Sequence, residues 1–138
     1  MKNNLLIDTN IFIYAIDEDS QFHEKAINLL SNPEYFFYTT SKNISECLVV
    51  LTKDNNLNIS PSECLEIINI LLSDITVIFP NQLSLKIFQE LIYKYNPRGL
   101  WIHDLEIASI SLAHGINTIV TQNIDDFKKI KEIDVKSL

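Results

Sequence analysis

Four short segments of this sequence place carboxylates beside apolar runs, where folding could bring them together. Asp8 follows the apolar run at 5–7, and Glu46 and Asp104 each lie early in a helix-like pattern. The fourth segment, 121–126, reads Thr-Gln-Asn-Ile-Asp-Asp. Carboxylates gathered without basic partners provide the hard oxygen ligands that Mg²⁺ and Mn²⁺ prefer. The spacing therefore predicts a divalent metal site.

A site of this kind suits phosphodiester hydrolysis. A metal ion orients the phosphate, lowers the pKa of a bound water and stabilises charge on the leaving oxygen, so no covalent nucleophile is required. Other chemistries lack their motifs. With 2 glycines the chain cannot form a glycine-rich nucleotide-binding loop, and Ser45 lacks the glycines of a nucleophile elbow. We interpret His103 as a surface or capping residue rather than a general base.

Each acid also has a structural interpretation. Glu46 and Asp104 could simply complement the dipole of a helix N-terminus, because acids are common there. Asp8 is harder to explain in this way, because a carboxylate between apolar runs is costly to bury unless it has a use. The inference of a metal site depends on the four segments together.

Apolar strand patterns alternate with helical patterns along the chain. Strands are predicted at 5–7, 35–39, 75–79 and 118–120, with a last strand around Ile133 and Val135. Helices are predicted at 11–16, 22–30, 41–52, 61–72, 81–95 and 101–114, with a polar loop at 53–58 and a short helical turn at 127–130. Ser41 is expected to cap the helix that holds Glu46, and Gly115 to follow the end of the helix at 101–114.

This alternation predicts an α/β fold. We expect a single three-layer α/β/α domain over 1–138, with a central, mostly parallel sheet of four or five strands. The carboxyl ends of parallel strands meet at one edge of the sheet, where open α/β sheets bind ligands. Asp8 and the segment 121–126 follow strands directly, so that edge is the expected place for the site.

Composition limits the functional classes. A chain of 138 residues that is 46% hydrophobic is expected to form one ordered domain, and neither a membrane-length apolar segment nor a signal peptide is predicted. Cys47 and Cys64 are interpreted as reduced core thiols, which favours a cytoplasmic location. The net charge of −7 argues against a free-standing nucleic-acid binder driven by electrostatics. It is compatible with a nucleic-acid enzyme and with a basic protein partner.

The order of these motifs resembles the PIN-domain ribonucleases. The matching segments are Asp-Thr-Asn at 8–10, Ser-Glu at 45–46, Asp104 with the Ile-Ala at 107–108, and Thr-x-Asn-x-x-Asp-Phe at 121–127. The short length is similar to the VapC-type toxins of toxin–antitoxin pairs. The resemblance covers nearly the whole chain, and four motifs in order make it fairly specific.

The resemblance implies a Mg²⁺- or Mn²⁺-dependent endoribonuclease. Asp8 and Asp104 would be the main metal ligands, and Glu46 would bind metal or activate water. Residues 121–126 would be the fourth contributor. Thr9, Asn10 and Thr121 would support the carboxylates by hydrogen bonds.

One position departs from the family pattern. The fourth acid often lies two residues after the Thr, where this chain has Asn123. Asn123 could ligate through its carbonyl oxygen with one negative charge fewer, and Asp125 or Asp126 could substitute for the missing acid. Asp126 could equally be a structural cap, so the number of metal ions stays open.

The resemblance also implies partners. Family members of this type commonly form homodimers and are bound by a small antitoxin that inserts a basic residue near the acids. RNA would be the substrate, and there would be no membrane partner. Basic candidates for phosphate contact are Lys42, Lys53, Arg98, Lys128, Lys129 and Lys131, although for each of them the interpretation as a solvated surface residue is favoured.

Two other functions stay open at this stage. A haloacid-dehalogenase-like phosphohydrolase would use Asp8 as a covalent nucleophile, but Asn10 and Phe12 do not fit the Asp-x-Asp-x-Thr pattern of that class. A non-enzymatic, flavodoxin-like interaction module would need no metal. Its receiver variant needs a phosphorylatable Asp after a middle strand, and 75–79 is not followed by one.

Overall fold

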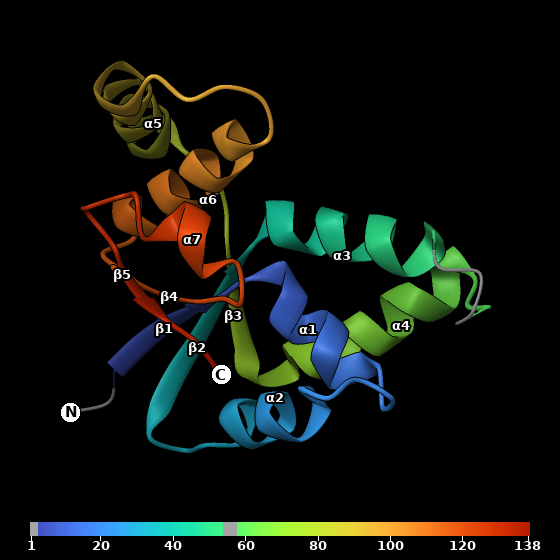
Figure 1. Ribbon diagram of the computed structural model, residues 1–138. Helices are drawn as coiled ribbons and strands as arrows, with labels where there is room; N and C mark the ends of the chain where they lie inside the picture. The colour runs from blue at the N-terminus through green and yellow to red at the C-terminus, as the bar shows by residue number, and fades with distance from the viewer. Residues whose placement is uncertain (1–2, 54–57) are drawn as a thin grey trace.

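A five-stranded parallel sheet forms the centre of the computed structural model, which describes residues 3–53 and 58–138 (Figure 1). The strands are β1 (Asn3–Ile7), β2 (Tyr35–Thr40), β3 (Ile75–Ile78), β4 (Thr118–Val120) and β5 (Asp134–Lys136), in the spatial order β3-β2-β1-β4-β5. Every neighbouring pair is parallel. The predicted α/β fold class is confirmed.

Helices connect the strands and cover both faces of the sheet (Figure 1). The helices are α1 (Thr9–Ile16), α2 (His23–Leu30), α3 (Ser41–Lys53), α4 (Pro61–Leu71), α5 (Gln82–Tyr95), α6 (Trp101–Ala113) and α7 (Ile124–Phe127), with a 3-10 turn, η1, at Leu72–Asp74. In the described part of the chain, no helix has the length and apolar character needed to cross a bilayer.

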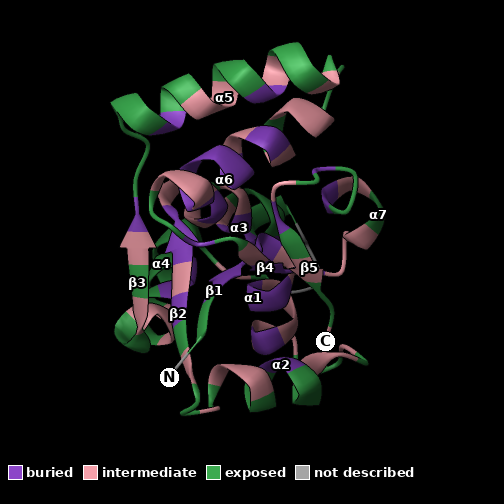
Figure 2. Cartoon of the chain, turned by 90° about the vertical axis from the view of Figure 1, so that its left-hand side faces the viewer, coloured by how far each residue is buried: buried purple, intermediate pink, exposed green. Residues whose placement is uncertain are grey.

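Alternate side chains of β1 enter two separate cores. Leu5 and Ile7 pack with α1, α3 and α4 on one face, in a core that includes Phe12, Cys47 and Cys64. Leu6 packs with α5 and α6 on the other face, together with Leu105, Ile110 and Ile119. Figure 2 shows the buried surfaces of α1 and α6 turned towards the sheet between them. Both cysteines are free and buried, as predicted.

The strand order places the carboxyl ends of β1, β2 and β4 next to one another. β1 is central, with β2 on one side and β4 on the other. The chain passes from β1 to β2 on one side of it, and later returns from β3 to β4 on its other side. A ligand site is expected at the point where the strand order reverses, between β1 and β4. Asp8, α3 and the segment after β4 all begin at this edge.

Several boundaries differ from the sequence-based expectation. α1 begins at Thr9 rather than at residue 11, because the Asp8 side chain caps it. Thr40, not Ser41, caps α3, because its hydroxyl accepts the backbone N–H of Asn43 at 3.1 Å. The last short helix is α7, Ile124–Phe127, so the turn predicted at 127–130 lies three residues too late. Of the predicted loop at 53–58, residues 54–57 lie outside the described residues.

The two-sided core makes Leu6 a sensitive position. Leu6 is fully buried, whereas Leu83 on α5 is 51% exposed. Leu6→Ala should lower the free energy of unfolding by about 3 kcal/mol, because it removes transfer energy and leaves a cavity. The matched control Leu83→Ala should cost less than about 1 kcal/mol. Urea unfolding followed by circular dichroism measures both, and equal losses would contradict the assignment of Leu6 to the core.

Candidate functional site

Asp8 lies at the centre of the site and is held by four hydrogen-bond donors. Its Oδ1 accepts the backbone N–H of Thr9 at 2.8 Å and the Nδ2 of Asn43 at 3.1 Å. Its Oδ2 accepts the hydroxyl of Thr121 at 2.6 Å and the Nδ2 of Asn10 at 3.3 Å. The side chain is only 6% exposed. The carboxylate orientation is therefore fixed from β1, α1, α3 and the end of β4.

Thr121 links the last segment to the first. Its fully buried hydroxyl donates to Asp8 and accepts from Asn10 Nδ2 at 3.3 Å and from the backbone N–H of Asn123 at 2.9 Å. Asn10 also accepts the backbone N–H of Gln122 through Oδ1 at 3.2 Å. Two of the three residues predicted to support the acids, Asn10 and Thr121, thus hold both Asp8 and the chain after β4.

Glu46 is positioned through Thr9. The Thr9 hydroxyl donates to Glu46 Oε2 at 2.9 Å and accepts from Asn43 Nδ2 at 3.0 Å. Glu46 is half-buried in the second turn of α3. The hydrogen bond from Thr9 uses only Oε2 of Glu46 and does not involve its second carboxylate oxygen, Oε1.

Sequence reasoning missed Asn43. Its side chain is fully buried, donates to Asp8 and Thr9, and accepts the Thr40 hydroxyl at 2.6 Å. It precedes Glu46 by three positions in the sequence, so both side chains lie on one face of α3. A polar residue at that spacing before the predicted acid, directly after the strand, is the signal that could have revealed it.

Asp104 completes the set from the other helical layer. It lies in the first turn of α6, and it lines the same open cavity of about 370 Å³ as Asp8, Glu46 and Asn123. Ile13, Tyr14 and Val50 form an apolar side of this cavity. Acids predicted from distant parts of the sequence are therefore brought to one place.

The remaining predicted acids lie outside this cavity. Asp126 forms an ion pair with Lys129 at 3.6 Å, and its backbone carbonyl accepts the Trp101 indole N–H at 3.0 Å. It nevertheless contributes to the electrostatic field at Asp104. Asp125 is 91% exposed and pairs with Lys128 at 3.5 Å. At the N-terminus of α7, Asn123 is the residue that lines the cavity together with Asp8.

Mutual repulsion and burial shape the titration of these acids. Burial raises the pKa of Asp8, against the lowering effect of its hydrogen bonds from Thr121 and Thr9. Burial, together with the charges of Asp8, Asp126 and Glu46, raises the pKa of Asp104 to about 7. The charges of these acids therefore act on one another at the site.

The donor set fits a hard divalent cation. The ion pairs of residues 3–53 and 58–138 join Lys42 to Glu106, Lys94 to Glu132, Lys128 to Asp125 and Lys129 to Asp126, and none includes Asp8, Glu46 or Asp104. Oxygen ligands without basic partners are what Mg²⁺ and Mn²⁺ require. Among the described residues, however, no group of three or more Asp, Glu, His or Cys side chains is arranged so that it could hold a metal ion.

Comparison with known proteins identifies what this arrangement resembles. A family model described as "PIN domain" matches residues 5–133. No curated protein sequence matches the chain significantly.

Solved structures of toxin–antitoxin proteins share the fold. VapBC2 of Rickettsia felis, bound to a promoter DNA fragment, has a TM-score of 0.74 at 23% identity and covers 97% of this chain and 98% of that chain. DNA-bound VapBC of Salmonella typhimurium has a TM-score of 0.71 at 22% identity, covering 99% and 98%. A VapC toxin of Mycobacterium tuberculosis that cleaves the sarcin–ricin loop has a TM-score of 0.69 at 14% identity, covering 91% and 95%. At these identities the likeness demonstrates the fold alone.

The raised pKa of Asp104 predicts a pH-dependent stability. The folded chain holds this proton with a pKa of about 7 against an ordinary 3.8, so stability from this group is greatest at low pH and falls as pH rises from about 4 to about 7. At pH 8 in EDTA, Asp104→Asn should stabilise the chain by about 1–2 kcal/mol, a value discounted because the carboxylate is partly exposed. At pH 4 it should have little effect.

Chemical unfolding at both pH values measures this difference. Asp134→Asn is the matched control, because Asp134 is exposed at the start of β5, at the opposite edge of the sheet. Equal stability of Asp104→Asn and wild type at pH 8 would show that Asp104 is not under electrostatic strain.

Proposed function

The chain belongs to the PIN-domain family, and on that premise we propose that it is a Mg²⁺- or Mn²⁺-dependent endoribonuclease, the toxin of a toxin–antitoxin pair. One observation carries the proposal: Asp8, Glu46 and Asp104 come from the sheet and from both helical layers, yet line one cavity without a basic partner in the described residues. The family match favours this reading over a dehalogenase-like phosphohydrolase and over an interaction module.

The proposed ligands are Asp8, Asp104 and Glu46. Asp8 is the fixed ligand, because four donors hold its orientation. Glu46 and Asp104 are less enclosed and would turn towards Asp8 to complete the coordination. Asn123 would contribute its side-chain oxygen, which brings no negative charge. When bound, the cation supplies neutralisation of phosphate charge and activation of water for attack on phosphorus.

The protein's own residues supply positioning and proton transfer. Thr9 fixes Glu46 through Oε2, which leaves Oε1 to ligate the cation or to accept a proton from the attacking water. Thr121 and Asn10 keep Asp8 and the Asn123 backbone together. The apolar side formed by Ile13, Tyr14 and Val50 limits water access from one direction.

The proposed partners are RNA, an antitoxin and a second copy of the chain. Support for an antitoxin comes from the shared fold with VapBC proteins and from the net charge of −7, which suits a basic segment. An apolar groove between α3 and α4, lined by Leu48, Val49 and Leu65, could contact the antitoxin. A toxin acting on cellular RNA would work in the cytoplasm.

Cleavage of a mixed RNA pool tests the proposal. The purified chain should cut RNA with Mn²⁺ or Mg²⁺ and not with EDTA. Asp8→Asn and Asp104→Asn should each lower the cleavage rate at least about 100-fold, because each removes a charged ligand. Asp104 lies outside the buried hydrogen-bond network of Asp8, so its variant should keep the fold even if Asp8→Asn does not.

Asp134→Asn serves as the control acid, and its cleavage rate should equal that of wild type. Cleavage that survives EDTA, or a folded Asp104→Asn that cuts as fast as wild type, would refute the proposal. The cut sites of the wild type would begin to define the RNA sequence it recognises.

A further inference from the structure

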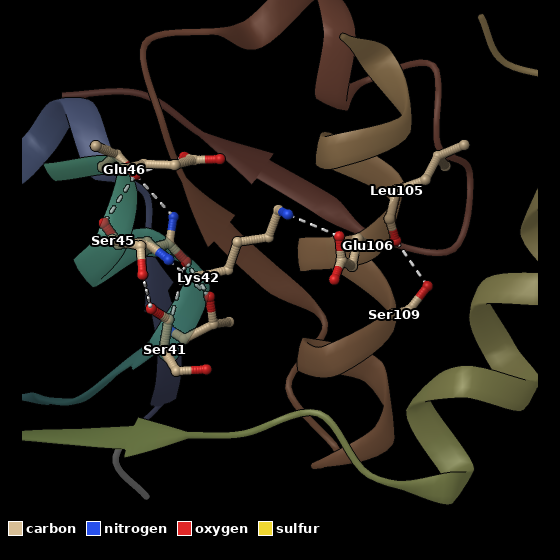
Figure 3. Close-up of polar contacts among 10 residues, drawn as sticks. Ser41, Lys42, Ser45, Glu46, Leu105, Glu106 and Ser109 are labelled. Carbon is tan, nitrogen blue, oxygen red and sulfur yellow. Dashed lines mark hydrogen bonds and ion pairs between the residues drawn. The ribbon is translucent and has the colours of Figure 1, made fainter. Parts of the chain in front are cut away.

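An ion pair joins the two helical layers beside the site. Lys42 Nζ of α3 lies 2.8 Å from Glu106 Oε2 of α6, and the two side chains are only 24% and 35% exposed. Figure 3 shows Lys42 extending from α3 to Glu106. It also shows Lys42 and Glu46 leaving α3 on the same side.

The two helices otherwise belong to different parts of the molecule. α3 packs on α1, α4 and β2, with Cys47 and Leu51 in the core on one face of the sheet. α6 packs on α5, α7 and β2, with Leu105 and Ile110 in the core on the other face. Glu46 and Asp104 therefore belong to separate layers, and their separation depends on how these layers are held together.

Lys42 and Glu106 lie close in sequence to these two acids. Lys42 is one helical turn before Glu46, on the same face of α3. Glu106 is two residues after Asp104, about 3 Å further along the axis of α6. The two side chains leave different faces of the helix, so Glu106 can act on Asp104 only through the backbone of α6. The ion pair thus connects the first turn of α3 to the second turn of α6, in the helices that carry the two acids.

The first turn of α6 needs such a connection. No side chain caps its N-terminus at Leu100. Trp101 ties this turn to α7 through the carbonyl of Asp126 at 3.0 Å. Lys42 ties the next part of α6 to α3. Asp104 lies between these two attachments.

We propose that the Lys42–Glu106 ion pair positions Glu46 and Asp104 at the separation that a divalent cation requires. The inference rests on the proposed function, because it concerns the same metal site. Lys42 and Glu106 are positioning residues, since they act through the two helices rather than by contact with the cation.

Removal of Lys42 gives opposite results under positioning and under simple electrostatics. Deleting a positive charge near a cation site should strengthen cation binding if charge alone matters. Under the positioning proposal, Lys42→Met should instead raise the Kd for Mn²⁺ three- to tenfold. Mn²⁺ titration followed by electron paramagnetic resonance measures the Kd directly, without RNA.

Further variants isolate the pair. Glu106→Gln should raise the Kd for Mn²⁺ by a similar factor. The double variant Lys42→Met/Glu106→Gln should bind Mn²⁺ no more weakly than either single variant, because each single substitution already removes the ion pair. The charge exchange Lys42→Glu/Glu106→Lys should return the Kd to within twofold of wild type.

Lys94→Met is the matched control, because Lys94 forms an ion pair of the same 2.8 Å length with Glu132. It should leave the Kd for Mn²⁺ within twofold of wild type. In EDTA the Tm of Lys42→Met should shift no more than that of Lys94→Met, which separates positioning of the acids from general stability.

The outcomes distinguish the inference from the proposed function. Consider first the case in which the wild type binds Mn²⁺ and the Asp104→Asn variant fails to bind it, as the proposed function requires. If Lys42→Met then binds Mn²⁺ as tightly as the wild type or more tightly, the positioning role alone is overturned. A wild type that binds no Mn²⁺ would overturn both the metal site and the positioning role.

Discussion

The burial of carboxylates close to one another is the constraint on which the site depends. Asp8 is buried, and its charge is one of those that raise the pKa of Asp104 to about 7. Four hydrogen bonds stabilise Asp8 in place, whereas Asp104 has no such network and lies partly open to solvent. The chain thus holds one acid rigidly and leaves others under electrostatic strain, and a divalent cation would relieve that strain.

The parallel sheet makes this concentration of charge possible. Asp8 follows the central strand, β1. Asn43 and Glu46 lie in the helix that follows β2, and Thr121 directly follows β4. Asp104 arrives from the opposite layer on α6. Ligands supplied by both layers make the geometry of the site sensitive to the packing between layers. A side-chain link across that boundary, the ion pair of Lys42 with Glu106, therefore matters beyond its small contribution to stability.

Much of this arrangement could be predicted from local sequence patterns. Apolar strands followed by helices specify a parallel sheet, and polar residues directly after the strands locate its active edge. Thr9, Asn10 and Thr121 followed from this logic and from the family resemblance. Asn43 did not, because its role depends on the depth at which α3 meets Asp8. The contacts of Asp126 were equally hidden, because no periodicity encodes its ion pair with Lys129 or the hydrogen bond from Trp101 to its backbone carbonyl.

The central claim is that Asp8 and Asp104 share a cation across the layers. Anomalous diffraction from crystals soaked in Mn²⁺ tests it most directly. The account predicts an anomalous peak in the cleft within about 2.5 Å of a carboxylate oxygen from each of these two residues. A cleft without a peak, in crystals that show ordered Mn²⁺ elsewhere, would contradict it.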